Sequence, residues 1–333
     1  MDLNQLIALT FQLSIFATVF GFGLKVTTED VLYVIQQPAL LARSLFAMFV
    51  VMPAVAAALA YLFGFKHAVE IALVALAISP LPPLIPKRLV KAGGEAPYAL
   101  ALLATVALLS VVIVPVLVAL LGRFFGRPFT PSEWHVVGIV AIFALLPFAA
   151  GMAFRRLWPA LAGRIEGPVL LVGGVVLRIA ALALLVTSWR AIWTLIGDGA
   201  VIAIAVFVVV GLVAGHLLGG PDADGRTTLA IATASRHPAI ALSIAAANSS
   251  EEGLLGAAIL LYLLLNAIIG APYTLWRQKQ HADAAAAAAI LEAQRKAVDD
   301  VRAGRPAPYY AVPPAASASG PSPQAGGDAV KPS

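Results

Sequence analysis

The sequence predicts an all-α polytopic membrane protein with nine transmembrane helices, and three observations lead to this fold class. Hydrophobic residues make up 61% and charged residues 12% of the 333-residue chain, against roughly 45–50% and 25% in soluble domains. From Met1 to about Gln280, short polar turns divide the apolar sequence into segments about as long as the ~20 residues that a helix needs to cross a bilayer. The segments are continuously apolar, whereas the strands of a membrane β-barrel alternate over ~10 residues, so helices are expected.

The first segment begins directly after the N-terminus, without the basic stretch of a cleavable signal peptide, and is therefore expected to be a span. Short loops with glycine and proline separate the later segments, as at Gly64, Gly93-Gly94, Gly126-Arg127-Pro128 and Gly219-Gly220-Pro221-Asp222. In order, the spans are expected at 3–24, 38–63, 68–90, 97–121, 134–154, 167–188, 199–218, 226–248 and 253–276.

Two regions of different character follow from this pattern. Residues 1–280 form the predicted transmembrane domain, and residues 281–333 form a predicted cytoplasmic tail. In the tail, the run Ala284–Ala289 and the residues after it favour a short helix, whereas the Pro, Ala, Ser and Gly content beyond Gly304 favours disorder. The chain has no cysteine, which excludes disulfides, thiolate metal sites and cysteine nucleophiles.

Lysine and arginine in the loops predict the orientation of the chain. One side of the membrane, which also holds the N-terminus, has four: Lys66, Arg123, Arg127 and Arg190. The other side has ten: Lys25, Lys87, Arg88, Lys91, Arg155, Arg156, Arg164, Arg226, Arg277 and Lys279. The positive-inside rule therefore places the N-terminus outside and the C-terminus in the cytoplasm of an inner or plasma membrane. The net charge of +5 is read as this loop asymmetry and not as a nucleic-acid surface.

The third and the eighth segments contain helix breakers where a spanning helix should be most regular. The third holds the run from Ser79 to Lys87, with Pro80, Pro82, Pro83 and Pro86, and the eighth holds Ser235-Arg236-His237-Pro238. The two are five segments apart, so they cross the membrane in opposite directions. Broken helices in corresponding positions of two halves indicate the binding site of an inverted-repeat secondary transporter.

A linear series of motifs resembles the bile acid:sodium symporter family over about residues 5–278. The matching residues are Phe20-Gly21-Phe22-Gly23-Leu24, Thr28-Glu29-Asp30, Pro38, Met52-Pro53, Ser79-Pro80, Ala92-Gly93-Gly94 and Pro115. The chain is similar to the nine-helix form, which lacks the first of ten helices. The resemblance implies a panel domain of segments 1, 5 and 6 and a core domain of segments 2, 3, 4, 7, 8 and 9. The two broken helices would cross at mid-membrane in the core, and an organic anion would bind between core and panel.

The sequence departs from the family at the positions that bind sodium in its sodium-coupled members. Ile85-Pro86 stands where a Ser-Asn pair is expected, and Ala232 and Arg236 stand where a Glu and a Gln are expected. Met48 replaces a further Gln in the second span. Sodium needs hard oxygen ligands, and carboxylates and amides are the usual source. These departures argue against sodium coupling.

Positive charge replaces those ligands, and each candidate residue has both a functional and a structural interpretation. Arg236 either substitutes for transported sodium or binds a substrate carboxylate or sulfonate, or it is a structural clamp on the carbonyls that Pro238 frees. Lys87 is a second cation at the crossing or an ordinary cytoplasmic anchor beside Arg88 and Lys91. His237 is a proton relay or a hydrogen-bonded packing residue. Arg178, in the sixth segment, attracts anions into the crevice or clamps the panel.

Uncharged polar side chains in the core segments complete the candidate site. We expect Thr105, Ser110 and Asn266 to satisfy broken backbone locally. The remaining polar positions at the breaks are Ser79, Thr233 and Ser235.

The predicted function is secondary active transport of a small organic anion by alternating access. Proton coupling, uniport and exchange stay open, with H+ or Na+ as the candidate coupling ions. One alternative is a sodium-dependent organic anion or bile acid-type symporter, and another is a non-transporting membrane receptor or accessory subunit. An enzyme is not expected, because acidic residues are essentially absent from the spans; accordingly no catalytic residue, cofactor or bound metal is predicted. The expected partners are the organic anion and the lipid bilayer, without nucleic acid.

Overall fold

The computed structural model describes residues 3–64, 66–82, 85–126, 137–138, 140–196, 199–246, 248 and 252–303. Within these ranges the regular structure is entirely helical. Six helical stretches among the described residues are long and apolar enough to cross a bilayer, and two apolar stretches, Gln12–Lys25 and His67–Ile78, are shorter. The predicted all-α polytopic membrane protein is confirmed, and the count of nine spans stays a prediction.

Most helices follow the predicted segments, but α10 already begins at Pro159, where the span was expected from 167, and α15 continues to Arg302, where the span was expected to end at 276. The first half contains α1 (Leu3–Lys25), α2 (Thr28–Ile35), α3 (Pro38–Phe46), η1 (Ala47–Val51), α4 (Met52–Leu62), α5 (His67–Ile78), α6 (Ile85–Lys91) and α7 (Ala96–Phe124). The second half contains η2 (Ala141–Leu145), α9 (Leu146–Leu157), α10 (Pro159–Thr187), α11 (Trp189–Leu195), α12 (Ala200–Leu218), α13 (Ala223–Ala234), α14 (Pro238–Ala246) and α15 (Glu252–Arg302).

The chain divides into two compact units, Met1–His281 and Ala282–Ser333. The predicted short helix of the tail falls within the bounds of α15. The predicted disorder beyond Gly304 lies outside the described residues.

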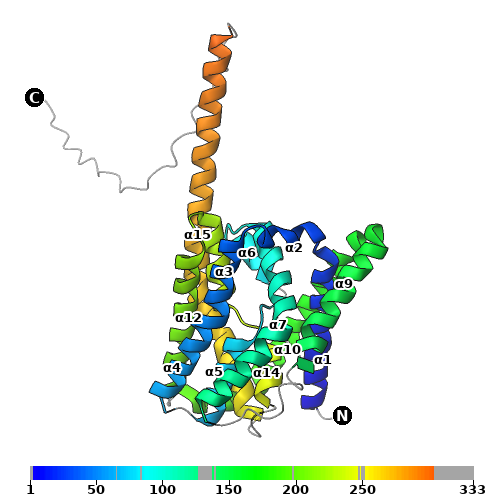
Figure 1. Ribbon diagram of the computed structural model, residues 1–333, viewed down its shortest axis with the longest axis vertical. Helices are drawn as coiled ribbons and strands as arrows, with labels where there is room; N and C mark the ends of the chain where they lie inside the picture. The colour runs from blue at the N-terminus through cyan, green and yellow to red at the C-terminus, as the bar shows by residue number, and fades with distance from the viewer. Residues whose placement is uncertain are drawn as a thin grey trace, which may run out of the picture. The chain divides into compact units, whose positions relative to one another are not determined.

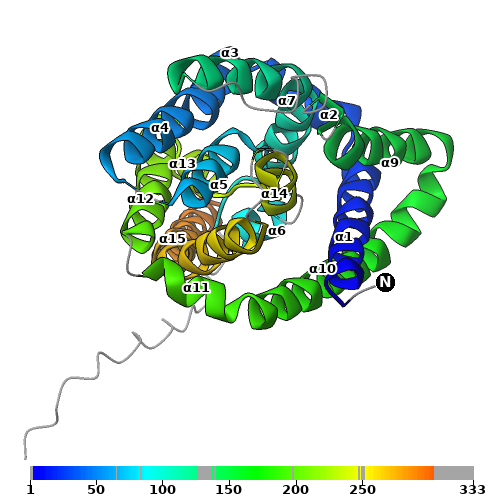
Figure 2. The same ribbon diagram turned by 90° about the horizontal axis from the view of Figure 1, so that it is seen from below.

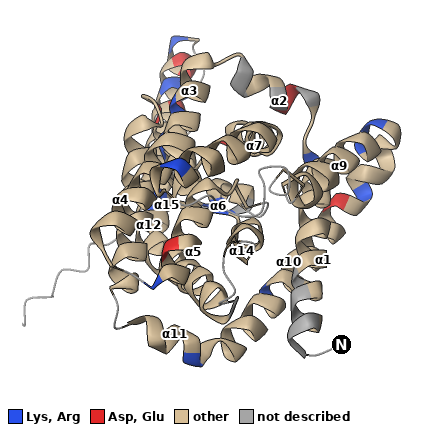
Figure 3. Ribbon diagram, turned by 60° about the horizontal axis from the view of Figure 1, so that its bottom comes forward, with Lys and Arg blue, Asp and Glu red and all other residues tan. Residues whose placement is uncertain are grey.

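Apolar side chains on the outward faces of the long helices match a lipid environment. On α7, the exposed residues Leu108, Val112, Val116 and Leu120 recur every four positions and so form one stripe along the helix. In Figure 3 most of the ribbon of these helices carries neither Lys and Arg nor Asp and Glu. The protein is thus an integral membrane protein.

Two spans contain a π-helical turn directly before a proline. The turn η1 precedes Met52-Pro53, and η2 precedes Leu146-Pro147. Proline has no N–H and crowds the preceding turn, and a wider π turn relieves that conflict without ending the helix. These helices therefore continue through their prolines but leave backbone carbonyls without their usual partners.

Helix α1 packs along both α9 and α10 through glycines. A Cβ atom added to Gly23 would lie 2.3 Å from the carbonyl oxygen of Phe148, and one added to Gly151 would lie 2.3 Å from that of Phe20. Backbones can approach this closely only where side chains are absent. Figure 2 shows α1, α9 and α10 together at one side of the unit, while α5 and α14 lie inside the ring formed by the surrounding helices.

The two broken helices are α5–α6 and α13–α14, which lie side by side in the interior (Figures 1 and 2). The first is interrupted after Ile78 and resumes at Ile85, and the second is interrupted at Ser235–His237. Asp222 caps the start of α13 by accepting hydrogen bonds from the backbone N–H groups of Asp224 and Gly225, at 3.0 and 2.9 Å. One correction concerns Pro86: it lies in the first turn of α6, where proline is tolerated, and not in the break.

Candidate functional site

The two helix breaks meet through their backbones. The N–H of His237 donates a hydrogen bond of 2.9 Å to the carbonyl oxygen of Pro80. Each of these groups is left without a helical partner by its own break, so each satisfies the other. This bond places the non-helical residues of the two breaks next to each other in the interior.

Arg236 connects a third element, the π turn η1, to this junction. Its side chain is 1% exposed; Nη2 donates to the carbonyl oxygen of Met48 at 3.0 Å, and Nη1 lies 3.4 Å from that of Ser79. The Met48 carbonyl is available because the N–H of Met52 bonds to Ala47 across η1 and the next residue, Pro53, has no N–H. Among the described residues, the ion pairs recorded are His67–Glu70, Arg155–Glu166 and His281–Asp224, so none involves Arg236.

The carbonyl freed by Pro238 has a different partner from the one that the sequence suggested. In a regular helix the N–H at position 238 would bond to the carbonyl of Ala234. Here the hydroxyl of Tyr262, on α15, donates to that carbonyl at 2.9 Å and accepts from the N–H of Arg236 at 2.6 Å. The clamp interpretation of Arg236 is therefore wrong in its detail, because Arg236 bonds carbonyls of other helices. Tyr262 was missed, and its only signal in the sequence is a polar group within an apolar span.

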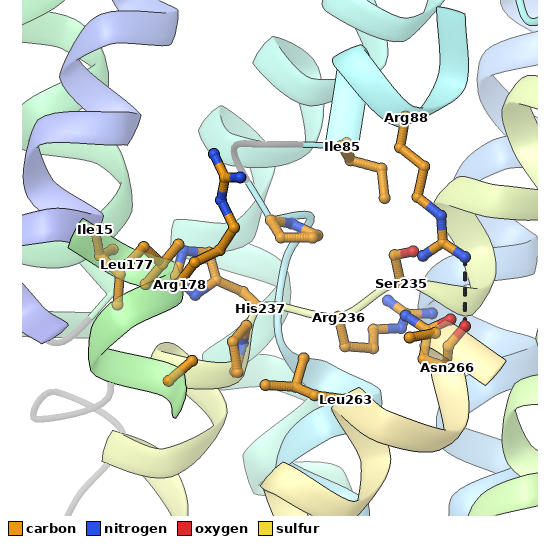
Figure 4. A pocket seen from close by; sticks show the side chains of 14 residues that line it. Ile15, Ile85, Arg88, Leu177, Arg178, Ser235, Arg236, His237, Leu263 and Asn266 are labelled. Carbon is orange, nitrogen blue, oxygen red and sulfur yellow. Dashed lines mark hydrogen bonds between the residues drawn. The ribbon is translucent and has the colours of Figure 1, made fainter. Parts of the chain in front are cut away.

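A cavity of about 290 Å³ lies beside the junction (Figure 4). One wall comes from α1 and α10, and the other comes from the two breaks, α6 and α15. The lining residues are Ile15, Pro82, Ile85, Arg88, Leu177, Arg178, Ala181, Ser235, Arg236, His237, Pro238, Leu263, Asn266 and Ala267. The site thus combines a mostly apolar lining with three arginines and no acidic residue.

Several buried polar atoms at the cavity lack a hydrogen-bond partner among the described residues. They are Ser235 Oγ, Arg236 Nε, His237 Nε2 and Asn266 Oδ1. The ring of His237 accepts at Nδ1 from the N–H of Ile240 at 3.4 Å. An accepting Nδ1 places the proton of the neutral ring on Nε2, so Nε2 is an unused donor. Buried donors without partners indicate a ligand or water that satisfies them.

The sequence of residues 12–215 matches the model of the Sodium Bile acid symporter family. The chain belongs to this family. No curated protein matches it. In this member of the sodium bile acid symporter family, the matched residues end within α12. The second break, with Arg236 and His237, lies beyond the matched residues.

Arg88 is the cation that the sequence missed at this symporter-family site. Its Nη2 donates to the backbone carbonyl oxygen of Asn266 at 3.3 Å, and the side chain lines the cavity (Figure 4). The sequence had grouped Arg88 with the loop anchors and singled out Lys87. The side chain of Lys87 lies outside the described residues.

Arg178 approaches the cavity from α10, on the opposite wall. Its Nε donates to the carbonyl oxygen of Gly174, one turn earlier in the same helix, at 2.9 Å. Figure 4 shows its guanidinium on the cavity side of α10. Of the predicted cations, the structure therefore brings Arg178 and Arg236 to one cavity.

The other polar residues named from the sequence have separate places. Ser79 and Ser110 donate to carbonyls of their own helices, those of Leu76 and Ala107, at 2.8 and 2.7 Å. The hydroxyls of Thr105 and Thr233 are buried without a partner among the described residues. Thus neither Thr105 nor Ser110 satisfies a broken backbone carbonyl at the junction. Pro80 lines a second, much smaller cavity of about 20 Å³ together with His237. Pro83 lies outside the described residues.

Two of the positions that the family resemblance assigned to sodium ligands carry no suitable side chain in the structure. Ala232 and Met48 are fully buried and carry no side-chain oxygen, and the Met48 carbonyl already accepts from Arg236. The described part of the chain has no group of three or more His, Cys, Asp or Glu residues that would hold a metal ion. The carbonyl oxygens of Met48 and Ser79 at this junction accept hydrogen bonds from the guanidinium of Arg236.

Proposed function

We propose that this protein is a secondary active transporter that carries a small organic anion across the membrane by alternating access. The observation that carries the proposal is the cavity at the helix breaks, where three arginines and no acidic residue line a mostly apolar space and one of the arginines, Arg236, is 1% exposed. A cation removed from water is costly unless its charge is compensated. A bound anion would compensate the positive charge while it occupies the cavity.

The position of the cavity supports alternating access. Its walls belong to two sets of helices: α1 and α10, which pack together with α9, and the interior broken helices with α15. We assign the first set to the panel domain and the second to the core domain. A rocking motion between them would open the cavity to one side of the membrane and then to the other.

Arg236 supports transport that does not depend on sodium. Its guanidinium contacts the carbonyl oxygens of Met48 and Ser79, and so places a permanent positive charge where the two broken helices meet the π turn η1. A cation that is covalently part of the chain holds these carbonyls in every state of the cycle. Proton coupling, uniport and exchange are all compatible with this arrangement. The loop charges support an external N-terminus and a cytoplasmic C-terminus.

The first test is the thermal stability of purified protein in sodium and in choline buffer, with a panel of organic anions. A ligand that binds only the folded protein raises its melting temperature by mass action. We expect a shift with anions that is equal in both buffers. A shift that requires sodium would instead favour a sodium-dependent symporter, and no shift with any anion would favour a receptor or accessory subunit.

Uptake into proteoliposomes tests the role of the cavity arginines. Arg178→Gln is expected to raise KM for the anion at least tenfold, because the arginine faces the cavity and forms no recorded ion pair among the described residues. Arg190→Gln is the matched control, since Arg190 is exposed on α11 and lies outside the lining. Equal loss in both variants would contradict a specific role for Arg178.

A further inference from the structure

The turn between α9 and α10 carries exposed cations that the transport proposal does not use. Arg156, near the end of α9, and Arg164, near the start of α10, are both exposed, and neither has a recorded ion pair among the described residues. Lys25, the last residue of α1, is exposed as well. Figure 3 shows Lys and Arg near this turn, beside the label of α9. These three cations do not line the cavity at the helix breaks.

A neighbouring arginine holds the three helices together at this turn. Nη1 of Arg155 donates to the carbonyl oxygen of Leu24 at 2.6 Å and lies 3.3 Å from a carboxylate oxygen of Glu166. These contacts join the end of α1, the end of α9 and the N-terminal part of α10. The recorded ion pair of Glu166 is with Arg155, so the charges of Arg156 and Arg164 stay uncompensated in the described part of the chain.

The length of α10 places these cations at the level of the lipid headgroups. With 29 residues, α10 is about 43 Å long at 1.5 Å per residue, close to the ~40–45 Å of a bilayer with its headgroups. The helix runs from 159 to 187, so its middle is residue 173 and Arg164 lies nine residues before it. Nine residues correspond to about 14 Å, near the ~15 Å half-thickness of the hydrocarbon. A helix centred in the bilayer therefore has Arg164 where hydrocarbon meets headgroups.

Large apolar side chains beside the cations suit the same level. Trp158, between α9 and α10, is 54% exposed, and its ring centre lies 5.1 Å from that of Phe154. Leu157 and Leu161 are also exposed at this turn. Tryptophan is enriched at the membrane interface, because its ring is apolar and its N–H is polar. The turn therefore combines arginines that suit a phosphate with apolar side chains that suit acyl chains.

We propose that the turn between α9 and α10 binds an anionic phospholipid, with Arg156 and Arg164 contacting its phosphate and Lys25 adding to the attraction. Arginine suits a phosphate because its planar guanidinium can donate two parallel hydrogen bonds. Charge complementarity favours an anionic lipid over a zwitterionic one, whose own ammonium group offsets its phosphate. A lipid is favoured over a soluble phosphate, since a soluble anion would leave the exposed Trp158 and its neighbouring leucines uncovered.

The lipid site has a consequence for the proposed transport cycle. The helices α9 and α10 belong, with α1, to the set that we assign to the panel domain. A bound headgroup holds this set at the membrane surface while the core moves relative to it. This consequence rests on the proposed function, whereas the lipid site itself does not.

The experiment titrates the purified full-length protein, depleted of lipid in a mild detergent, with phosphatidylglycerol and with phosphatidylcholine of the same acyl chains. Binding is measured by the rise in melting temperature and by native mass spectrometry, and neither measurement needs transport activity. We expect phosphatidylglycerol to bind at least tenfold more tightly, with an affinity that falls as salt is raised. Equal binding of the two lipids would overturn the proposal.

A soluble headgroup distinguishes a lipid site from a phosphate site. Glycerol 1-phosphate carries the same phosphate without acyl chains, and we expect it to bind at least tenfold more weakly than phosphatidylglycerol. If it raises the melting temperature as much as the lipid at equal concentration, the turn is a site for soluble phosphates and the lipid assignment is wrong.

Variants of the turn test the two arginines. Arg156→Gln/Arg164→Gln is expected to weaken phosphatidylglycerol binding about 25-fold, at about fivefold for each cation removed. The matched control is Lys91→Gln/Lys279→Gln, which removes two exposed cations of the same predicted side from α6 and α15 and should bind like the wild type. The single variant Arg164→Gln, with an expected loss of about fivefold, gives the same test if the double variant unfolds. Equal losses in the two double variants would show a response to overall charge and refute a site at this turn.

Discussion

Tyr262 and Arg236 are joined by a hydrogen bond of 2.6 Å, in which the backbone N–H of Arg236 donates to the tyrosine hydroxyl. The same hydroxyl donates to the carbonyl of Ala234. One side chain from α15 therefore replaces two backbone hydrogen bonds that the break between α13 and α14 removes. It does so at the residue whose guanidinium connects three helical segments.

Tyr262→Phe is expected to destabilise the protein by about 2–6 kcal/mol, because it leaves a buried N–H and a buried carbonyl unpaired at about 1–3 kcal/mol each. The measurement is the melting temperature or the denaturant midpoint in detergent. Tyr61→Phe is the control, since Tyr61 is 81% exposed and should change little. Equal stability of the two variants would contradict the bridging role of Tyr262.

Arg236→Ala is expected to abolish anion uptake or to make it depend on an added cation. The reason is that the carbonyls of Met48 and Ser79 then lose their permanent positive partner. Arg236→Gln keeps a hydrogen-bond donor without the charge, and tests the charge in case the alanine variant folds poorly. Uptake is measured in proteoliposomes with and without sodium. Wild-type uptake in both variants would rule out a role for the charge.

Gly151→Ala is expected to destabilise the packing of α1 against α9, because the new Cβ would lie 2.3 Å from the carbonyl oxygen of Phe20. The helices must separate to accept it, and overpacking of this kind typically costs about 1–3 kcal/mol. Gly163→Ala, in α10, is the matched control: its Cβ meets nothing within 4 Å. Melting temperatures should fall for the first variant only. A fall for Gly163→Ala alone would refute this account of the interface.

Asp222→Ala is expected to cost about 1 kcal/mol, the typical effect of removing a helix N-cap. Its carboxylate accepts from the N–H groups of Asp224 and Gly225 at the start of α13. Asp222→Asn retains an accepting oxygen and should recover most of the loss. Hydrogen exchange of the amides at 224 and 225 reports the cap directly; unchanged protection in Asp222→Ala would show that the cap is unimportant.

The sequence was sufficient to locate the breaks, because proline clusters in an apolar background have few other interpretations. It was insufficient for the partners of the break, since those depend on contacts between distant segments. The bond from Arg236 to the Met48 carbonyl exists only because η1 shifts the backbone register before Pro53. No local pattern in the sequence predicts that shift.

The choice of Lys87 over Arg88 illustrates a second limit. A non-helical link separates α5 from α6, so the helical phase of α5 cannot be continued across it. Which face of α6 looks inward is then set by tertiary packing, and it is Arg88 that lines the cavity. Pro86 was misjudged for the same reason, because the point at which α6 begins cannot be read from the prolines alone.

The covalent attachment of Arg236 has an electrical consequence. An ion that travels with its substrate offsets the charge moved in each turnover, whereas a guanidinium that belongs to the chain stays behind. If no other ion accompanies the anion, each cycle moves one net negative charge. A membrane that is negative inside then favours outward movement by about 2.3 kcal/mol per 100 mV. The resting voltage would make such a protein an exporter unless the anion is far more concentrated outside.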